Sequence, residues 1–128
     1  CLIVDDNPFN LVVATHIMHD KGYQIKTALN GKEAIEVAQK SCSKGDVLKI
    51  ILMDCQMPVM DGYQATRELN QLMKQGTVNS CPIVALTANQ MSDKFINLCK
   101  EVGMSGWLSK PLQHDELEKT LKKLQKRV

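Results

Sequence analysis

The fold is decided by residues 50–62, whose sequence is IILMDCQMPVMDG. Four large apolar residues lead directly into Asp54, and Pro58 and the Asp61-Gly62 pair prevent the strand from continuing. An apolar run without alternation is typical of a strand that is buried on both faces of a parallel sheet. Because open α/β sheets bind their ligands at the carboxyl ends of their strands, we expect Asp54 to act as a nucleophile there.

Short apolar runs alternate with helical patterns along the whole chain. The expected strands are residues 2–4, 23–29, 47–53, 82–86 and 106–109. The expected helices follow Asn7-Pro8, Asn30-Gly31 and Asp61-Gly62, and two more carry apolar stripes over residues 91–102 and 117–128. Strands that alternate with helices in this way imply right-handed crossovers. We therefore predict a doubly wound α/β fold, a five-stranded parallel sheet covered by helices on both faces.

The first expected helix repeats apolar residues at helical spacing, which predicts its inner face. We expect His16 to be packed on that face rather than to carry a phosphoryl group, and the three histidines show no metal-ligand spacing. The residues spaced in this way are Phe9, Val12, Val13, His16 and Ile17.

Length, charge and hydropathy limit the possible functions. The 128 residues suffice for one domain, which we expect to span 1–128 and to be excised from a longer chain, since Cys1 leads almost directly into a strand. The net charge of +2 does not indicate nucleic-acid binding, and the basic residues between 119 and 127 read as a solvated helix face. The apolar runs are too short to cross a membrane. We therefore expect a cytoplasmic domain without membrane contact, whose parent protein could be membrane-anchored.

The five cysteines are irregularly spaced and contain no C-x-x-C pair, so neither a disulfide framework nor a zinc site is indicated. Reduced thiols in a cytosolic compartment are the expected state. Cys55 directly follows Asp54, but neighbouring strand residues point to opposite faces, so Cys55 is not required for the chemistry.

Polar residues follow the apolar runs of four expected strands. In a parallel sheet the carboxyl ends of the strands lie on one edge, so residues far apart in sequence converge there. Carboxylates that converge repel one another and need a cation, and Mg²⁺ prefers oxygen ligands. A lysine and a hydroxyl beside them would suit the oxygens of a phosphoryl group transferred to a carboxylate. The converging residues are Asp5, Asp6, Asp54, Thr87 and Lys110.

Four segments of the chain together resemble the receiver domain of two-component response regulators. They are VDDNP at the start, MDCQMPVMDG, ALTA and WLSKP, and they occur in the family's order and at similar spacing. The resemblance covers essentially all 128 residues. The MDCQMPVMDG segment especially resembles receivers that are attached to hybrid histidine kinases. The resemblance implies a flavodoxin-like fold with strand order 2-1-3-4-5.

The resemblance also implies roles for individual residues. Asp54 would accept a phosphoryl group from the histidine of a histidine kinase or a histidine phosphotransfer protein. Asp6 and Asp54 would bind Mg²⁺ directly together with the backbone carbonyl of Gln56, and Asp5 would act through water. Lys110 would hold a phosphoryl oxygen.

Further implied roles concern the switch that reads the phosphoryl group. Thr87 would bond another phosphoryl oxygen, and the small Ala88 would leave the site open. Gln56 and Asn89 match positions that tune how long the acyl phosphate survives. Trp107 takes the place where the family usually has Tyr or Phe, an aromatic residue that turns inward. This is a departure, because indole is larger and only donates a hydrogen bond.

The expected protein is a phosphoacceptor switch with self-phosphotransfer and slow autodephosphorylation, rather than an enzyme with a turnover substrate. Three alternatives stay open at this point. An aspartyl phosphatase would need a carboxylate where Gln56 stands, and a flavin carrier would need a hydroxyl- and glycine-rich loop where Asp5 and Asp6 stand. A degenerate receiver that only docks partners would not need the acidic, hydroxyl and lysine residues.

Overall fold

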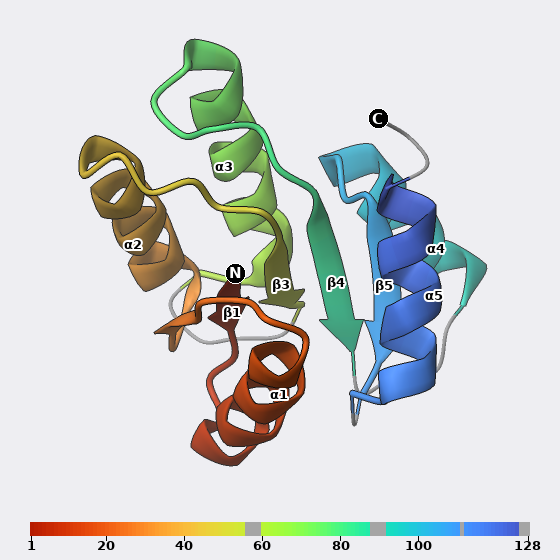
Figure 1. The fold of residues 1–128 in the computed structure, drawn as a ribbon. Helices are drawn as coiled ribbons and strands as arrows, with labels where there is room; N and C mark the ends of the chain where they lie inside the picture. The colour runs from red at the N-terminus through yellow and green to blue at the C-terminus, as the bar shows by residue number, and fades with distance from the viewer. Residues whose placement is uncertain (56–59, 88–91, 111, 126–128) are drawn as a thin grey trace.

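Within residues 1–55, 60–87, 92–110 and 112–125, which are the residues that the computed structural model describes, five strands form one parallel sheet (Figure 1). The strand order is β2-β1-β3-β4-β5, as predicted. The strands are β1 (Leu2–Val4), β2 (Lys26–Ala28), β3 (Ile51–Asp54), β4 (Ile83–Thr87) and β5 (Gly106–Ser109). The helices between them are α1 (Pro8–Asp20), α2 (Gly31–Ser43), α3 (Gly62–Gln75), α4 (Asp93–Val102) and α5 (His114–Gln125).

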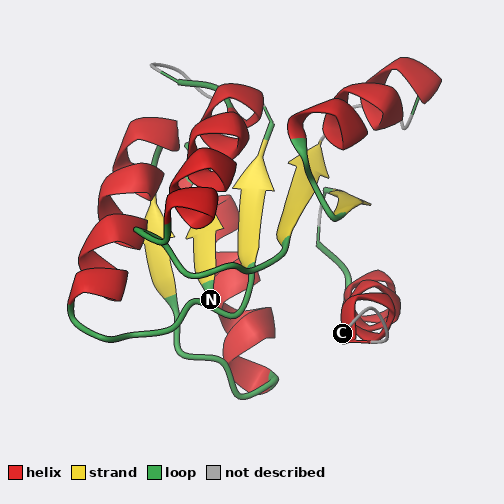
Figure 2. Ribbon diagram, turned by 90° about the horizontal axis from the view of Figure 1, so that it is seen from above, coloured by secondary structure: helices red, strands yellow, loops and turns green. Residues whose placement is uncertain are grey.

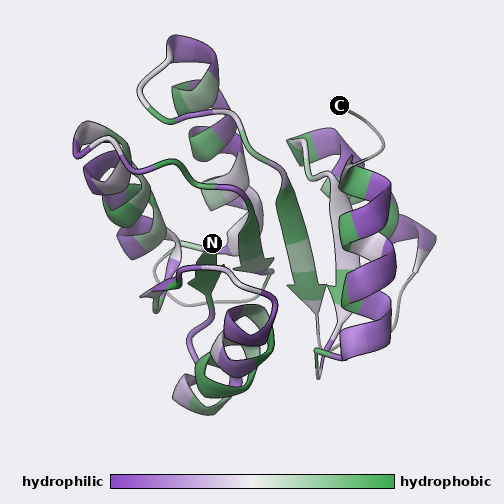
Figure 3. Ribbon diagram, viewed as in Figure 1, coloured by the Kyte–Doolittle hydropathy of each residue, from purple (hydrophilic) through white to green (hydrophobic). Residues whose placement is uncertain are grey.

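The helices cover both faces of the sheet (Figure 2). α1 and α5 pack on one face and α2, α3 and α4 on the other, so β1, β3, β4 and β5 contribute alternate residues to two cores. In β3, for example, Ile51 and Met53 face α2 and α3, whereas Leu52 faces α1 and α5. The central strands are accordingly hydrophobic up to their last residues, while the helices carry many polar residues (Figure 3).

Two strands are shorter than the predicted 23–29 and 47–53. The reason is the length of their neighbours: β2 pairs only with the three residues of β1, starting at the pair Leu2 and Lys26. The ladder of β3 likewise begins where Ile51 meets Leu2 and Ile83. Strand length therefore depends on partners that the local sequence does not reveal. At the other end β3 and β4 each run one residue further than predicted and include Asp54 and Thr87.

The predicted inner face of α1 is wrong in part. Phe9 and Val12 are 72% and 56% exposed, and His16 is exposed rather than packed. Ala14, Ile17 and Met18 are the buried residues of this helix. Apolar residues lie on nearly every side of α1, so their spacing does not identify a single buried face.

The helix ends follow the predicted capping residues. The side chain of Asn7 accepts a hydrogen bond from the backbone N–H of Phe9, and Asn30 caps α2 in the same manner. Gly103 ends α4 in the left-handed conformation, with φ 93°. The predicted starting residue of the α4 stripe, Met91, lies outside the described residues. None of the described helices is both long and apolar enough to span a membrane.

Candidate functional site

The register of the sheet brings the predicted site residues to one edge. Val4 of β1 pairs with Met53 of β3, so the residues that follow them, Asp5 and Asp54, lie side by side at this edge. Thr87, the last residue of β4, pairs with Ser109 of β5. Lys110 comes next, and its backbone N–H donates a 2.7 Å hydrogen bond to the carbonyl of Thr87. Four strands thus deliver polar groups to the carboxyl edge.

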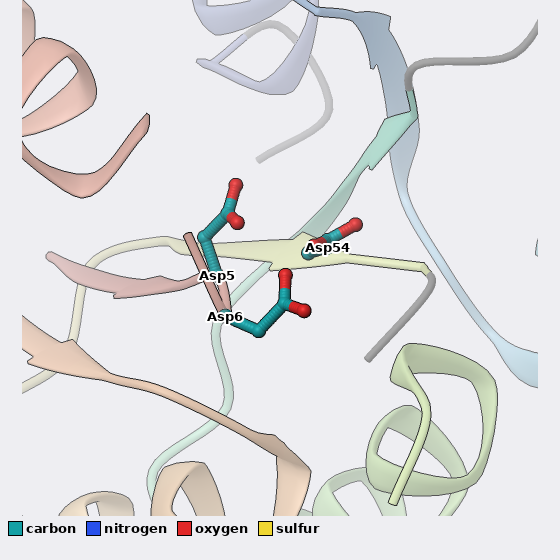
Figure 4. A group of neighbouring side chains, drawn as sticks. All are labelled: Asp5, Asp6 and Asp54. Carbon is teal, nitrogen blue, oxygen red and sulfur yellow. The ribbon is translucent and has the colours of Figure 1, made fainter. Parts of the chain in front are cut away.

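Three carboxylates form a cluster at this edge (Figure 4). Asp5, Asp6 and Asp54 each offer an oxygen, and the three oxygens lie within 4.8 Å of one another. Asp5 and Asp54 are 1% and 3% exposed, whereas Asp6 is exposed. Carboxylates at this separation repel one another, and burial strengthens the repulsion because the local dielectric is low.

Lys110 offsets part of this negative charge. Its ammonium Nζ lies 2.9 Å from an oxygen of Asp5 and 3.0 Å from an oxygen of Asp54. Burial by itself would lower the pKa of Lys110, but the hydrogen bonds and charges of the two aspartates outweigh burial and raise the pKa above its usual value. Lys110 therefore stays charged at neutral pH. One monovalent cation does not balance three carboxylates, so the cluster retains an affinity for further positive charge.

The carboxylates fit Mg²⁺ in their donor chemistry. All three groups supply hard oxygen ligands, and an exposed member such as Asp6 leaves one side of the cluster open to water or substrate. Three of the predicted residues of this site, Gln56, Ala88 and Asn89, lie outside the described residues.

The backbone of Asp54 is also tightly packed, a feature that the sequence did not predict. A Cβ atom on Gly62 would overlap the carbonyl oxygen of Asp54 and would lie 2.9 Å from the Asp54 carbonyl carbon and the Cys55 Cα. Only glycine lets α3 begin this close to the strand. A second glycine, Gly31, donates its N–H to the carbonyl of Met60 over 3.2 Å. The sequence pattern predicts only that Asp61-Gly62 ends the strand and precedes a helix, whereas in the structure Gly62 also permits this close approach.

Cys55 faces away from the carboxylates, as the alternation of strand residues predicts. Its side chain is buried in the core under α2, α3 and α4 and shares hydrogen bonds with Tyr63 and Cys99. Burial raises the pKa of the Cys55 thiol to about 12, so little thiolate exists at neutral pH. All five cysteines are free thiols.

Trp107 lies outside the carboxylate cluster. It pairs with Ala85 across the β4–β5 ladder, three residues before Lys110, and its half-buried ring packs against the core on the α4 side. Thr87 is 4% exposed at the end of β4. The structure thus brings together the three aspartates and Lys110 and places Thr87 next to them in the sheet.

A doubly wound sheet in this strand order, with an acidic cluster and a lysine at its carboxyl edge, defines a flavodoxin-like α/β domain. The chain belongs to the response regulator receiver domain family, whose model matches residues 1–122. Receiver domains of this family act in two-component phosphorelay signalling.

The relatives are parts of hybrid kinases. The chain is 40% identical over 125 residues to hybrid signal transduction histidine kinase B of Dictyostelium discoideum, covering 91% of this chain and 6% of the relative. It is 35% identical over 127 residues to the sensor histidine kinase RcsC of Escherichia coli, covering 99% of this chain and 12% of the relative. The chain therefore spans only a small part of the relatives that it matches.

Solved structures agree on the fold. The receiver domain of the Arabidopsis thaliana histidine kinase CKI1, complexed with Mg²⁺ and BeF₃⁻, superimposes with a TM-score of 0.84 at 30% identity, covering 98% of this chain and 88% of that one. The receiver domain of sensor histidine kinase PA1611 from Pseudomonas aeruginosa, which has a magnesium ion coordinated in its active site cleft, gives a TM-score of 0.77 at 36% identity, covering 96% and 93%.

Proposed function

We propose that Asp54 accepts a phosphoryl group from a phosphohistidine of a histidine kinase or a histidine phosphotransfer protein. The observation that carries this proposal is the buried Asp54 carboxylate, which is ion-paired with Lys110 and clustered with two further carboxylates. Burying a carboxylate is costly unless it is paired or binds a metal, and such buried, paired carboxylates are concentrated at functional sites. Membership of the receiver family and the Mg²⁺ complexes of its structural neighbours support the same assignment.

The transfer step is a displacement at phosphorus. An oxygen of Asp54 attacks the phosphorus atom, the P–N bond to the partner histidine breaks, and the imidazole leaves with the electron pair of that bond. Asp5, Asp6 and Asp54, with the backbone carbonyl of Gln56, would hold Mg²⁺, which supplies positive charge against the phosphoryl oxygens. Burial keeps bulk water away from Asp54 and strengthens these electrostatic interactions.

The groups around Asp54 would bind the oxygens of the new phosphoryl group. Lys110 would exchange its ion pair with Asp54 for one with a phosphoryl oxygen, and the hydroxyl of Thr87 would donate to another. Ala88 would leave the site open, while Gln56 and Asn89 would set the lifetime of the acyl phosphate and keep its hydrolysis slow. The domain would then be a switch between two conformations rather than an enzyme with a turnover substrate.

The partner would dock on the first turns of α1. Phe9 and Val12 are large apolar side chains that stay mostly exposed, and α1 starts two residues after Asp6. A small cavity of about 50 Å³ separates Phe9 and Val13 of α1 from Lys110 and Leu112 beside the site. A helical partner that covers these apolar residues would bring its histidine close to Asp54.

We also infer that the chain is one segment of a hybrid histidine kinase, because its relatives are hybrid kinases of which the matching region is a small part. The expected cytoplasmic location of the domain stays a prediction.

The test uses two phosphoryl donors. With Mg²⁺ and acetyl phosphate, the wild type should take up one phosphoryl group, detected by intact mass, and EDTA should prevent the uptake. Asp54→Asn should lose uptake from every donor, whereas Asp46→Asn, which removes an exposed carboxylate paired with Lys26, should behave as wild type. Phosphoryl uptake by Asp54→Asn equal to that of the wild type would contradict the proposal.

The second donor tests docking. Phe9→Ala should slow transfer from a phosphorylated histidine phosphotransfer domain but leave uptake from acetyl phosphate unchanged, because the small donor needs no docking surface. Equal rates from the protein donor in Phe9→Ala and wild type would exclude α1 as the docking site.

A further inference from the structure

The side chain of Trp107 is covered by a cation from the neighbouring helix. The ammonium of Lys100, on α4, lies 5.9 Å from the centroid of the Trp107 ring, within the range of a cation–π interaction. One side of the indole therefore packs on the hydrophobic core, and the positive charge of Lys100 lies over the ring. This contact links α4 to β5, which lie side by side in the fold (Figure 1).

Lys100 lies on the firmly held half of α4. Cys99 and Val102, on either side of Lys100, are the buried residues of this helix. The side chain of Asn70, on α3, donates a 2.9 Å hydrogen bond to the carbonyl of Val102. The first residues of the helix, Asp93 and Lys94, are exposed. The C-terminal half of α4 thus has a defined position from which Lys100 reaches the ring.

β5 connects this contact to the candidate site. Trp107 is three residues from Lys110, whose ammonium pairs with Asp5 and Asp54. Lys110 is also hydrogen-bonded through its backbone to the carbonyl of Thr87. A change of charge at Asp54 acts on Lys110 first and therefore on the end of the strand that carries Trp107.

We propose that Lys100 and Trp107 form a latch that holds α4 against β5 while Asp54 is unmodified and that must open in the conformational response to its phosphorylation. The inference rests on the proposed function of Asp54. A cation–π contact at an exposed site shifts an equilibrium about two- to fivefold. A latch of that size biases two conformations without preventing either, as a switch requires.

The test compares three variants with the wild type, two of which replace Lys100. Lys100→Met keeps the length of the side chain and removes the charge, and Lys100→Arg keeps a cation over the ring. Lys94→Met makes the same substitution at an exposed position of the same helix and is the matched control. Binding of beryllofluoride in the presence of Mg²⁺ is measured by calorimetry, which does not depend on Trp107.

Lys100→Met should reach half-saturation at an about two- to fivefold lower beryllofluoride concentration than wild type, because the unmodified conformation has lost its latch. Lys100→Arg and Lys94→Met should match wild type. Equal affinities of Lys100→Met and Lys94→Met would overturn the latch, and so would a Lys100→Arg protein that behaves like Lys100→Met.

A second readout separates the latch from the proposed function. Trp107 is the single tryptophan of the chain, so acrylamide quenching of its fluorescence reports on the ring in the ligand-free protein. Quenching should be stronger in Lys100→Met than in Lys100→Arg and Lys94→Met. If the wild type binds no beryllofluoride at all, the proposed function fails, and quenching that is identical in all four proteins would overturn the latch independently.

Discussion

Polar groups inside the fold are compensated differently at the carboxyl ends and at the amino ends of the strands. At the carboxyl edge Asp5 and Asp54 are buried with full charges, and Lys110 pairs with both. At the amino edge the half-buried side chain of Asn79 is a neutral amide. Asn79 bonds both backbone groups of Leu48, donating 2.7 Å to its carbonyl and accepting 3.0 Å from its N–H.

This difference separates function from stability. Neutral hydrogen bonds that are fully satisfied hold the loops before β3 and β4 together and call for no ligand. Three carboxylates beside one lysine store repulsion that a bound cation or a transferred group can relieve. Substitutions of the charged groups at the carboxyl edge should therefore change ligand binding, whereas substitutions of the hydrogen-bonding groups at the amino edge should change stability only.

The largest effect should come from the packing around Asp54. Gly62→Ala should lower the free energy of unfolding by about 3 kcal/mol, since the new Cβ would overlap the backbone of Asp54 and the backbone cannot give way cheaply. The matched substitution at the amino edge is Gly106→Ala, whose Cβ would meet a methyl group of Thr120 at 3.4 Å. That variant should stay within about 1 kcal/mol of wild type. Urea unfolding of both proteins gives the comparison.

Equal destabilisation by the two alanine substitutions would show that the close approach of α3 to Asp54 is not required. That result would contradict the proposed difference in packing between the carboxyl edge and the amino edge.

The next largest effect concerns the repulsion among the three carboxylates. Asp6→Asn should weaken Mg²⁺ binding about tenfold or more, because it replaces the negative charge of a proposed ligand by a neutral amide. Without Mg²⁺ the same variant should be as stable as wild type or more stable, since one of three repelling charges is gone. Calorimetric Mg²⁺ titration and urea unfolding in EDTA measure the two quantities. A loss of stability in EDTA would contradict the repulsion at this edge.

The sequence predicts which polar residues converge at the carboxyl edge, because Asp5, Asp54 and Thr87 each directly follow an apolar run, while their roles stay a prediction. The run before Asp54 predicts a buried strand, and the parallel topology places the ends of β1, β3, β4 and β5 on one edge. The sequence does not distinguish Asp5 from its neighbour Asp6. The structure does, since Asp5 is buried and ion-paired, whereas Asp6 faces solvent.

Contacts between residues that are far apart in the sequence could not be predicted where no local sequence pattern marks either partner. Nothing near Asn79 marks it as the partner of Leu48, and nothing near Lys100 marks it as the cover of Trp107. The exposure of Phe9 escaped prediction for a different reason: α1 is apolar on nearly every side, so spacing alone does not select its buried face.

The smallest of the effects should occur at the amino edge. Asn79→Ala should lower the free energy of unfolding by about 1–2 kcal/mol, because it leaves the N–H and the carbonyl of the buried Leu48 without their partner. Asn97→Ala, on the exposed side of α4, should be neutral or slightly stabilising, since alanine is the better helix former. Both variants should bind Mg²⁺ as wild type does. A change in Mg²⁺ affinity in Asn79→Ala would mean that the two edges are coupled, and the separation of stability from function along the sheet would then be wrong.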